Sequence, residues 1–213
     1  MSSRQGGGRI QKGSYAEGAV LWLNCQVPRR GSMPRLIAAL LALVLTPTVC
    51  LGSEGDDQAN SFAKIYASLC MKNLLDLEAL RTQLKPMPKL PPDKAALFLA
   101  GHPGDAWPVP DKSGLFVLSL PAGKSFCSVH VRRANTATVI KLFTQLVANP
   151  PSPLTAKLLK NEQKQTALNG PTQTISYEWS VPNAKRTMMF TLTTASSNSA
   201  QLQVLGSAAM ISR

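Results

Sequence analysis

The chain has 213 residues, of which 44% are hydrophobic, 6% aromatic and 16% charged, and its 23 Lys and Arg outnumber 11 Asp and Glu for a formal net charge of +12. These values exclude an acidic disordered tail, a collagen-like fibre and a membrane protein with many spans. They fit one globular domain preceded by a leader, with a basic surface that mildly attracts anions.

Residues 33–52 have the layout of a secretory signal peptide. A short positive start at Met33 and Arg35 is followed by ten unbroken apolar residues over 36–45 and then by small residues up to Gly52. The apolar run is too short to span a bilayer, which needs about 20 residues, and a buried core helix is the other interpretation. We therefore expect a periplasmic or otherwise exported protein, cleaved after Gly52.

Two features around this leader leave alternatives open. Cys50 could carry a lipid and anchor the protein as a lipoprotein, although residues 47–49 depart from the usual lipobox, which prefers Gly or Ala directly before the cysteine. Residues 1–32 are Gly-rich, carry Arg and show no hydrophobic period. We expect translation to begin at Met33, which makes 1–32 a mis-called or disordered extension.

Two cysteines, Cys70 and Cys127, remain for the domain that follows the leader. Because paired thiols oxidise in an exported protein, the simplest expectation is one disulfide that joins an N-terminal helix to a strand. A zinc site that adds His102 and His130 is the rival interpretation, but zinc ligands normally come in close pairs and these four are isolated. A Cys–His nucleophile pair is also disfavoured, since oxidation would consume the thiol. We therefore expect no metal.

The first part of the mature chain is predicted to be helical. Residues 53–60 are acidic and polar and indicate a flexible start, after which apolar residues recur at helical spacing from Ser61. Short helices are also predicted over 76–84 and 93–100, on either side of a proline-rich stretch that forbids regular structure.

Strands surrounding one amphipathic helix are predicted next. Residues 106–110 are typical of an edge strand, because proline cannot donate to a ladder, and 115–120 of a central strand, because it is apolar on both faces. Residues 125–133 alternate as a third strand. Asn135 is expected to cap a helix over 136–148, whose apolar residues form one stripe.

The last third of the chain is predicted to be an antiparallel meander. Strands are expected over 174–181, 186–194 and 201–211, while 154–170 is ambiguous between a loop and a strand with an exposed face. Residues 61–213 are thus predicted to form a single α+β domain. The N-terminal helices and the later helix are expected on one face of an antiparallel sheet of about five to six strands.

Asp105 and Trp107 are the first candidate site residues. The chain has no nucleophile elbow, phosphate-binding loop, zinc-protease motif or dinucleotide fingerprint, and no cofactor is expected. Trp107 could line a ligand cleft with Asp105 as a polar anchor. The alternative is a core or edge tryptophan beside a turn aspartate.

A second candidate site is a basic patch on the strand over 125–133. His130 and Arg132 share one face of this strand, and with Arg133 they could contact an anionic group; otherwise they are ordinary solvated side chains on an open face. No aromatic residues are interleaved on that face, so nucleic-acid binding is not expected. Glu178, on an outward-facing strand position, is predicted to lie at the surface.

Several short segments stand out together: a helix with Cys70, Leu-Pro-Pro-Asp at 90–93, 104–110, 114–118, Cys127 with 132–134, 177–179 and 190–194. Together they resemble a small family of exported proteobacterial proteins, sometimes labelled lipoproteins, that has no established activity. The resemblance covers roughly residues 60–210, implies a bacterial envelope location and a Cys70–Cys127 pair, and transfers no catalytic residue.

The sequence therefore predicts an exported cell-envelope protein that is a non-enzymatic accessory or binding module. Its expected partner is an envelope protein or an anionic surface, and it would touch the membrane only through a lipid on Cys50. The alternative function is a small periplasmic hydrolase with a cleft near Asp105, Trp107 and His130.

Overall fold

The computed structural model describes residues 53–212, so the predictions about residues 1–52, including the signal peptide and Cys50, lie outside the described residues. Helices occupy much of the N-terminal part, and a further helix separates the third and fourth strands. These helices are α1 (Glu54–Ile65), which continues as the π-helix η1 (Tyr66–Met71), α2 (Leu77–Leu84), α3 (Pro92–Leu99) and α4 (Thr136–Ala148). Within residues 53–212, no helix is long and apolar enough to cross a membrane.

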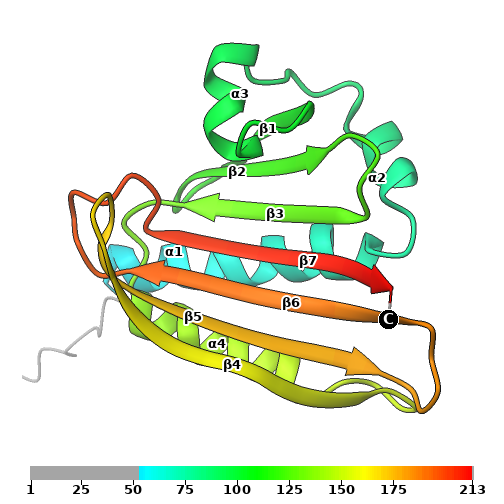
Figure 1. The fold of residues 1–213 in the computed structure, drawn as a ribbon. Coiled ribbons are helices and arrows are strands. Elements are labelled where there is room, and N and C mark those ends of the chain that lie inside the picture. The colour runs from blue at the N-terminus through cyan, green and yellow to red at the C-terminus, as the bar shows by residue number, and fades with distance from the viewer. Residues whose placement is uncertain (1–52, 213) are drawn as a thin grey trace, which may run out of the picture. The chain divides into compact units, whose positions relative to one another are not determined.

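Seven strands form one antiparallel sheet in the order β1-β2-β3-β7-β6-β5-β4 (Figure 1). This exceeds the expected five to six, because the ambiguous segment over 154–170 contains a long strand. The strands are β1 (Gly104–Asp111), β2 (Gly114–Pro121), β3 (Phe126–Val131), β4 (Thr155–Thr166), β5 (Gly170–Ser180), β6 (Arg186–Ala195) and β7 (Val204–Ser212). The single α+β domain is confirmed, and β1 is an edge strand as its prolines predict.

Helix α1 begins earlier than expected, and the segment over 53–60 is helical rather than a flexible start. The side chain of Ser53 accepts a hydrogen bond from the backbone N–H of Asp56, which caps the helix. Acidic side chains in a first turn also favour the positive end of the helix dipole. The carboxylate of Asp56 accepts the hydroxyl hydrogen of Thr138 at 2.6 Å and so joins α1 to α4. The polar composition therefore marks a helix start and not a loop.

The main core lies between the sheet and the layer of α1, η1 and α4. Phe62 and Tyr66 are fully buried there, and a Cβ on Gly206 of β7 would lie only 2.6 Å from the Phe62 ring. Cys70 of η1 and Cys127 of β3, both fully buried, form the expected disulfide, with their Cα atoms 5.4 Å apart. The predicted pairing of these two cysteines is confirmed.

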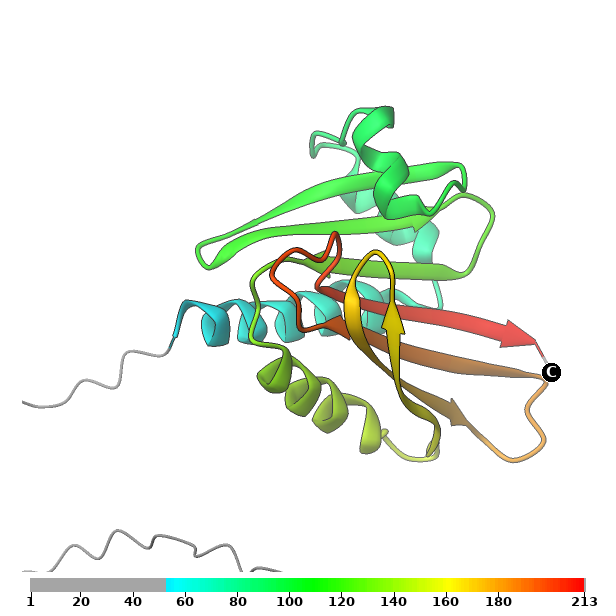
Figure 2. The same cartoon turned by 60° about the vertical axis from the view of Figure 1, so that its left-hand side comes forward.

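Helix α3 lies on the opposite face of the sheet, so the prediction that all helices cover one face is wrong. Its residues Ala95 and Leu99 pack with Ala106 of β1 and Val117 of β2 in a small separate core. Figure 2 shows α3 lying against the β1 and β2 end of the sheet, away from α1 and α4. The physical reason is that β2 is apolar on both faces, and its second face needs a cover of its own.

The placement of Glu178 also differs from expectation. Its side chain points away from the main core, as predicted, but it is only 7% exposed and so does not lie at the surface. Its strand lies inside the sheet, where Lys157 of β4 and Met189 of β6 flank it in register. The hydroxyl of Thr187 donates a hydrogen bond to its carboxylate at 3.3 Å.

Candidate functional site

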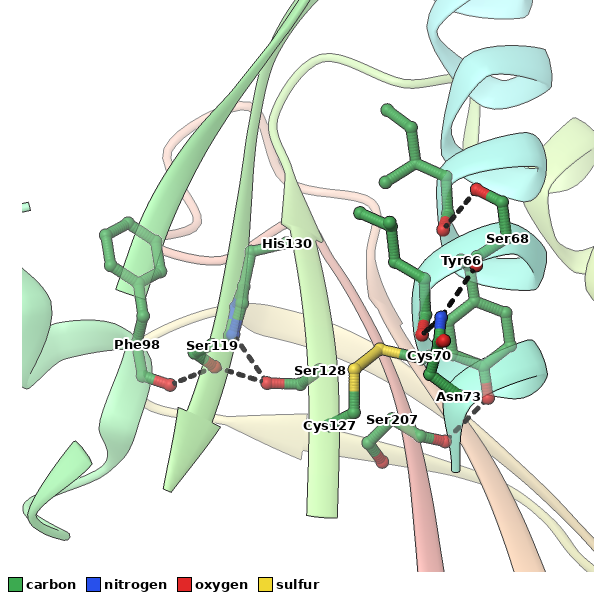
Figure 3. The surroundings of a disulfide bond; sticks show 12 residues. Tyr66, Ser68, Cys70, Asn73, Phe98, Ser119, Cys127, Ser128, His130 and Ser207 are labelled. Atoms are coloured by element: carbon green, nitrogen blue, oxygen red, sulfur yellow. Dashed lines mark hydrogen bonds between the residues drawn. A yellow bond between two sulfur atoms is a disulfide. The ribbon is translucent and has the colours of Figure 1, made fainter. Parts of the chain in front are cut away.

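A chain of buried polar side chains runs beneath α3. The hydroxyl of Ser119 donates to the carbonyl oxygen of Phe98 at 3.0 Å, and the Ser119 and Ser128 hydroxyl oxygens are 2.6 Å apart. Ser128 in turn lies 3.2 Å from Nε2 of His130 (Figure 3). The ring of Phe98 meets the imidazole edge-on at a centroid distance of 5.0 Å. Backbone and side chain of Phe98 therefore both fasten α3 to β2 and β3.

This series of hydrogen bonds determines which ring nitrogen of His130 carries the hydrogen. Ser119 has one hydroxyl hydrogen and gives it to the Phe98 carbonyl, so Ser128 must donate to Ser119. Ser128 has then used its own hydrogen and can only accept from Nε2–H of His130. Nδ1 has no hydrogen-bond partner within residues 53–212. Burial lowers the pKa of His130 to about 4, against a smaller opposing effect of the Phe98 carbonyl, so the ring is neutral at pH 7.

The arrangement around His130 does not fit a serine nucleophile. Ser119 and Ser128 are 0% and 1% exposed, and both hydroxyl hydrogens are engaged in the chain described above. Nδ1 of His130 has no hydrogen-bond partner within residues 53–212, so no carboxylate there accepts a hydrogen from it, as the usual Ser–His–Asp arrangement requires. This series of hydrogen bonds therefore holds α3 in place, and neither serine in it is positioned to attack a substrate.

Asp105 and Trp107 do not join His130 in a cleft. Trp107 is 1% exposed and belongs to the main core. Its neighbour Ala106 lies on the other face of the sheet, which is covered by α3 and also carries His130. Asp105 pairs with Lys89 at 2.9 Å and with Arg81 at 3.5 Å. Asp105, Trp107 and His130 therefore do not line a common cleft. Trp107 is a core residue, which was the alternative interpretation of its sequence position.

His130, Arg132 and Arg133 do come together, on a cavity of about 720 Å³ that we call the α3 groove. The strand face that carries them was expected to be open, but α3 covers part of it and turns it into a concave surface. The groove is bounded by α3, the turn between β1 and β2, the start of α1, and the segment 198–203 between β6 and β7. Its volume is in the range of about 300–1,000 Å³ that is usual for small-molecule sites.

The corner that carries the two arginines is held by two other segments of the chain. Arg133 has a left-handed backbone with φ of 66°, which is uncommon for a residue with a side chain. Its N–H donates to the side-chain oxygen of Gln203, and the amide nitrogen of Gln203 donates to the carbonyl of Ser197 at 3.0 Å. Next to it, the N–H of Asn135 donates to the carbonyl of Gly55 in α1 at 2.8 Å. The backbone around the arginines is therefore fixed by two other segments, α1 and the connection between β6 and β7.

Lys112 supplies a third cation to the α3 groove from the turn between β1 and β2. The turn is anchored by Asp111, whose carboxylate accepts the N–H of Ser113 and the hydroxyl of Ser61, each at 2.8 Å. These hydrogen bonds, first from Ser113 and then from Ser61, lower the pKa of Asp111. Internal donors thus already engage this carboxylate.

The charges of the α3 groove are unevenly satisfied. Its other carboxylate, Glu54, accepts a long hydrogen bond of 3.5 Å from Gln58. By contrast, no ion pair within residues 53–212 involves Lys112, Arg132 or Arg133. The ion pairs of this range are formed by cations of other segments. Among residues 53–212 the groove therefore presents three cations outside any ion pair, and of these Lys112 interacts at longer range with the carboxylate of Asp111.

Sequence reasoning missed several groove residues. Lys112, Gln203 and the leucines Leu97 and Leu115 come from three segments that are distant from His130 in sequence. No local spacing connects them, because the groove exists only once α3 crosses to the second face of the sheet.

Comparison of the chain with models of protein families, with curated proteins and with solved structures finds no match. The resemblance to exported proteobacterial proteins therefore stays a prediction. Within residues 53–212, no three His, Cys, Asp or Glu side chains lie close enough together to hold a metal ion.

Proposed function

We propose that this protein is an exported, non-enzymatic binding module of the bacterial cell envelope and that the α3 groove takes an anionic ligand. The observation that carries the proposal is the trio of Lys112, Arg132 and Arg133, which line one cavity without an ion-pair partner among the described residues. A fixed backbone at the arginines favours binding, because less order has to be created when the ligand arrives.

Export is supported by two independent features. The signal-peptide layout of residues 33–52 is one, and the buried Cys70–Cys127 disulfide, which persists in oxidising compartments, is the other. We therefore expect the protein to mature outside the cytoplasm, beginning at Ser53.

The hydrolase alternative has less support. Its expected residues Asp105 and Trp107 point to the other face of the sheet from His130. A buried neutral imidazole with a pKa of about 4 is a weak general base near pH 7, where a base is best matched to the ambient pH.

Native mass spectrometry of the protein isolated from the cell envelope tests this function. We expect a non-covalent small-molecule adduct on the wild-type protein, and a denatured mass that corresponds to residues 53–213 with one disulfide. The variant Arg132→Gln/Arg133→Asn should lose the adduct at least tenfold, since Asn tolerates the left-handed backbone while the charge is removed.

The matched control is Lys72→Gln/Lys157→Gln, which removes the same charge at two exposed positions that do not line the groove. This control should keep the adduct. Equal retention in all three proteins, or a wild-type protein without an adduct, would contradict ligand binding by the groove. Ester hydrolysis that disappears in His130→Gln would instead support the enzyme.

A further inference from the structure

We infer that the ligand of the α3 groove is an anionic amphiphile, a small molecule in which an alkyl chain ends in a phosphate or carboxylate. This inference rests on the proposed function and adds the chemical class of the ligand. It comes from the apolar side chains that share the groove with the three cations.

Two large apolar side chains on the groove are open to solvent. Leu115 is 66% exposed and Leu97 is 46% exposed, and they come from different elements, β2 and α3. Phe98, Val117 and Leu202 also line the groove. Single exposed leucines are ordinary, but several apolar side chains on one concave surface are typical of a binding site.

The apolar and cationic parts of the groove are neighbours. Val117 of β2 pairs with His130 of β3 in the antiparallel register. Phe116 pairs with Val131 at the last position of this ladder. Leu115 directly precedes Phe116 and Arg132 directly follows Val131, so both lie at the same end of the two strands, where both line the groove. A ligand that covers Leu115 therefore lies at the end of the groove that carries Arg132. That juxtaposition matches a molecule with an apolar part joined directly to an anion.

The form of the site favours one small molecule over a membrane surface. The arginines and leucines line a concavity of about 720 Å³, bounded by four segments, which is the size of a site for one ligand. Two carboxylates also line the groove: Asp111 accepts hydrogen bonds from Ser61 and Ser113, and Glu54 accepts one from Gln58. The three cations still outnumber these two carboxylates. The charged groups on the groove are then Glu54 and Asp111 against Lys112, Arg132 and Arg133, with His130 neutral.

Isothermal titration calorimetry with three probes tests this inference on the purified protein. The probes are octyl phosphate, which has both parts, inorganic phosphate, which lacks the chain, and octyl glucoside, which lacks the charge. All are used below the concentrations at which they form micelles. We expect octyl phosphate to bind at least tenfold more tightly than either of the others, because burial of the chain and pairing of the anion add together.

Two leucine variants identify the apolar half of the site. The variant Leu97→Ser/Leu115→Ser should bind octyl phosphate about tenfold more weakly than the wild-type protein and should bind inorganic phosphate with unchanged affinity. The matched control is Leu75→Ser/Leu168→Ser, which alters two leucines that are 75% and 77% exposed and lie outside the groove. The control should bind all three probes like the wild-type protein.

The outcomes separate this inference from the proposed function. If inorganic phosphate binds as tightly as octyl phosphate, or if Leu97→Ser/Leu115→Ser has no effect, the amphiphile is wrong while anion binding stands. If octyl glucoside binds as tightly as octyl phosphate, or if no probe binds, both proposals fail. If Leu75→Ser/Leu168→Ser loses as much affinity for octyl phosphate as Leu97→Ser/Leu115→Ser, the alkyl chain binds non-specifically and the inference is also overturned.

Discussion

The imidazole of His130 is only 5% exposed and is neutral at pH 7, because burial disfavours its charged form. Its Nε2–H is committed to Ser128, and its face is met by Phe98. Asp105 has different surroundings, because its half-buried carboxylate forms ion pairs with Lys89 and Arg81. His130 is therefore a structural support at the floor of the α3 groove.

Neutral burial of His130 makes stability depend on pH in a defined direction. Its pKa is about 4 in the folded protein and about 6.5 in an unfolded chain, so between these values the unfolded chain binds more protons. The contribution is fully present above about pH 6.5 and is lost as the pH falls toward 4, by about 3 kcal/mol in all.

Urea unfolding at pH 7 and pH 4 measures this effect, with His130→Gln as the control that cannot titrate. The wild-type protein should lose clearly more free energy of unfolding over this interval than the variant. Carboxyl groups with lowered pKa values, such as Asp56 and Asp111, titrate in both proteins and cancel in the comparison. An equal loss in the two proteins would contradict neutral burial of His130.

At the scale of elements, α3 packs on the sheet through a small core of its own. It begins with Pro92 at its first position and ends at Leu99, and the following residue Ala100 has a left-handed backbone with φ of 48°. Its own small core consists of Ala95 and Leu99 against Ala106 and Val117, separate from the large core under α1 and α4. Local opening of α3 would therefore disturb one wall of the groove and leave the main core intact.

Substitution of Leu99 by Ala should loosen α3 selectively. Leu99 is 5% exposed, and removal of a buried leucine side chain typically costs about 2–5 kcal/mol. Hydrogen–deuterium exchange followed by mass spectrometry should show faster exchange over 92–100, with unchanged exchange in α1. Acceleration that is equal in α1 would mean that α3 and the main core open as one unit.

Local patterns in the sequence predict some elements well. The helix over 136–148 is found with the same bounds, since Asn135 caps it through the N–H groups of Ala137 and Thr138 and its apolar stripe faces the core. The edge position of β1 follows from its prolines. By contrast, β4 is polar along most of its length because it is an exposed edge strand, so its composition resembles a loop.

Which face an element covers is not encoded locally, and this accounts for the errors that matter for function. The apolar residues of 93–100 predict a helix but do not say that it crosses to the second face of β1 and β2. Strand alternation predicts that His130 and Arg132 share one face, and Arg133 joins them because it is adjacent to Arg132 in the sequence. Their meeting with Lys112 and Leu97 depends on the tertiary fold.

At the scale of the whole molecule, the disulfide joins the helical N-terminal part to the middle of the sheet. Cys70 and Cys127 are 57 residues apart, and closing a loop of this length stabilises a protein by about 4 kcal/mol in the chain-entropy model. Both cysteines are fully buried, so the bond lies inside the core that α1 and η1 share with β3.

The variant Cys70→Ala/Cys127→Ala should therefore lose roughly 2–4 kcal/mol of stability, measured by urea unfolding of the oxidised wild-type protein and the variant. Reductant should lower the stability of the wild-type protein toward that of the variant and leave the variant unchanged. A variant as stable as the wild type would mean that the bond contributes nothing beyond packing.

The position of β7 has a consequence for biogenesis. This last strand lies between β3 and β6 and completes the middle of the sheet. A chain that leaves a ribosome or a translocation pore from its N-terminus can form β1-β2-β3 and β4-β5-β6, but each retains an unpaired edge until residues 204–212 emerge. Such edges are templates for aggregation, so the nascent protein is expected to depend on holding chaperones until its final residues are released.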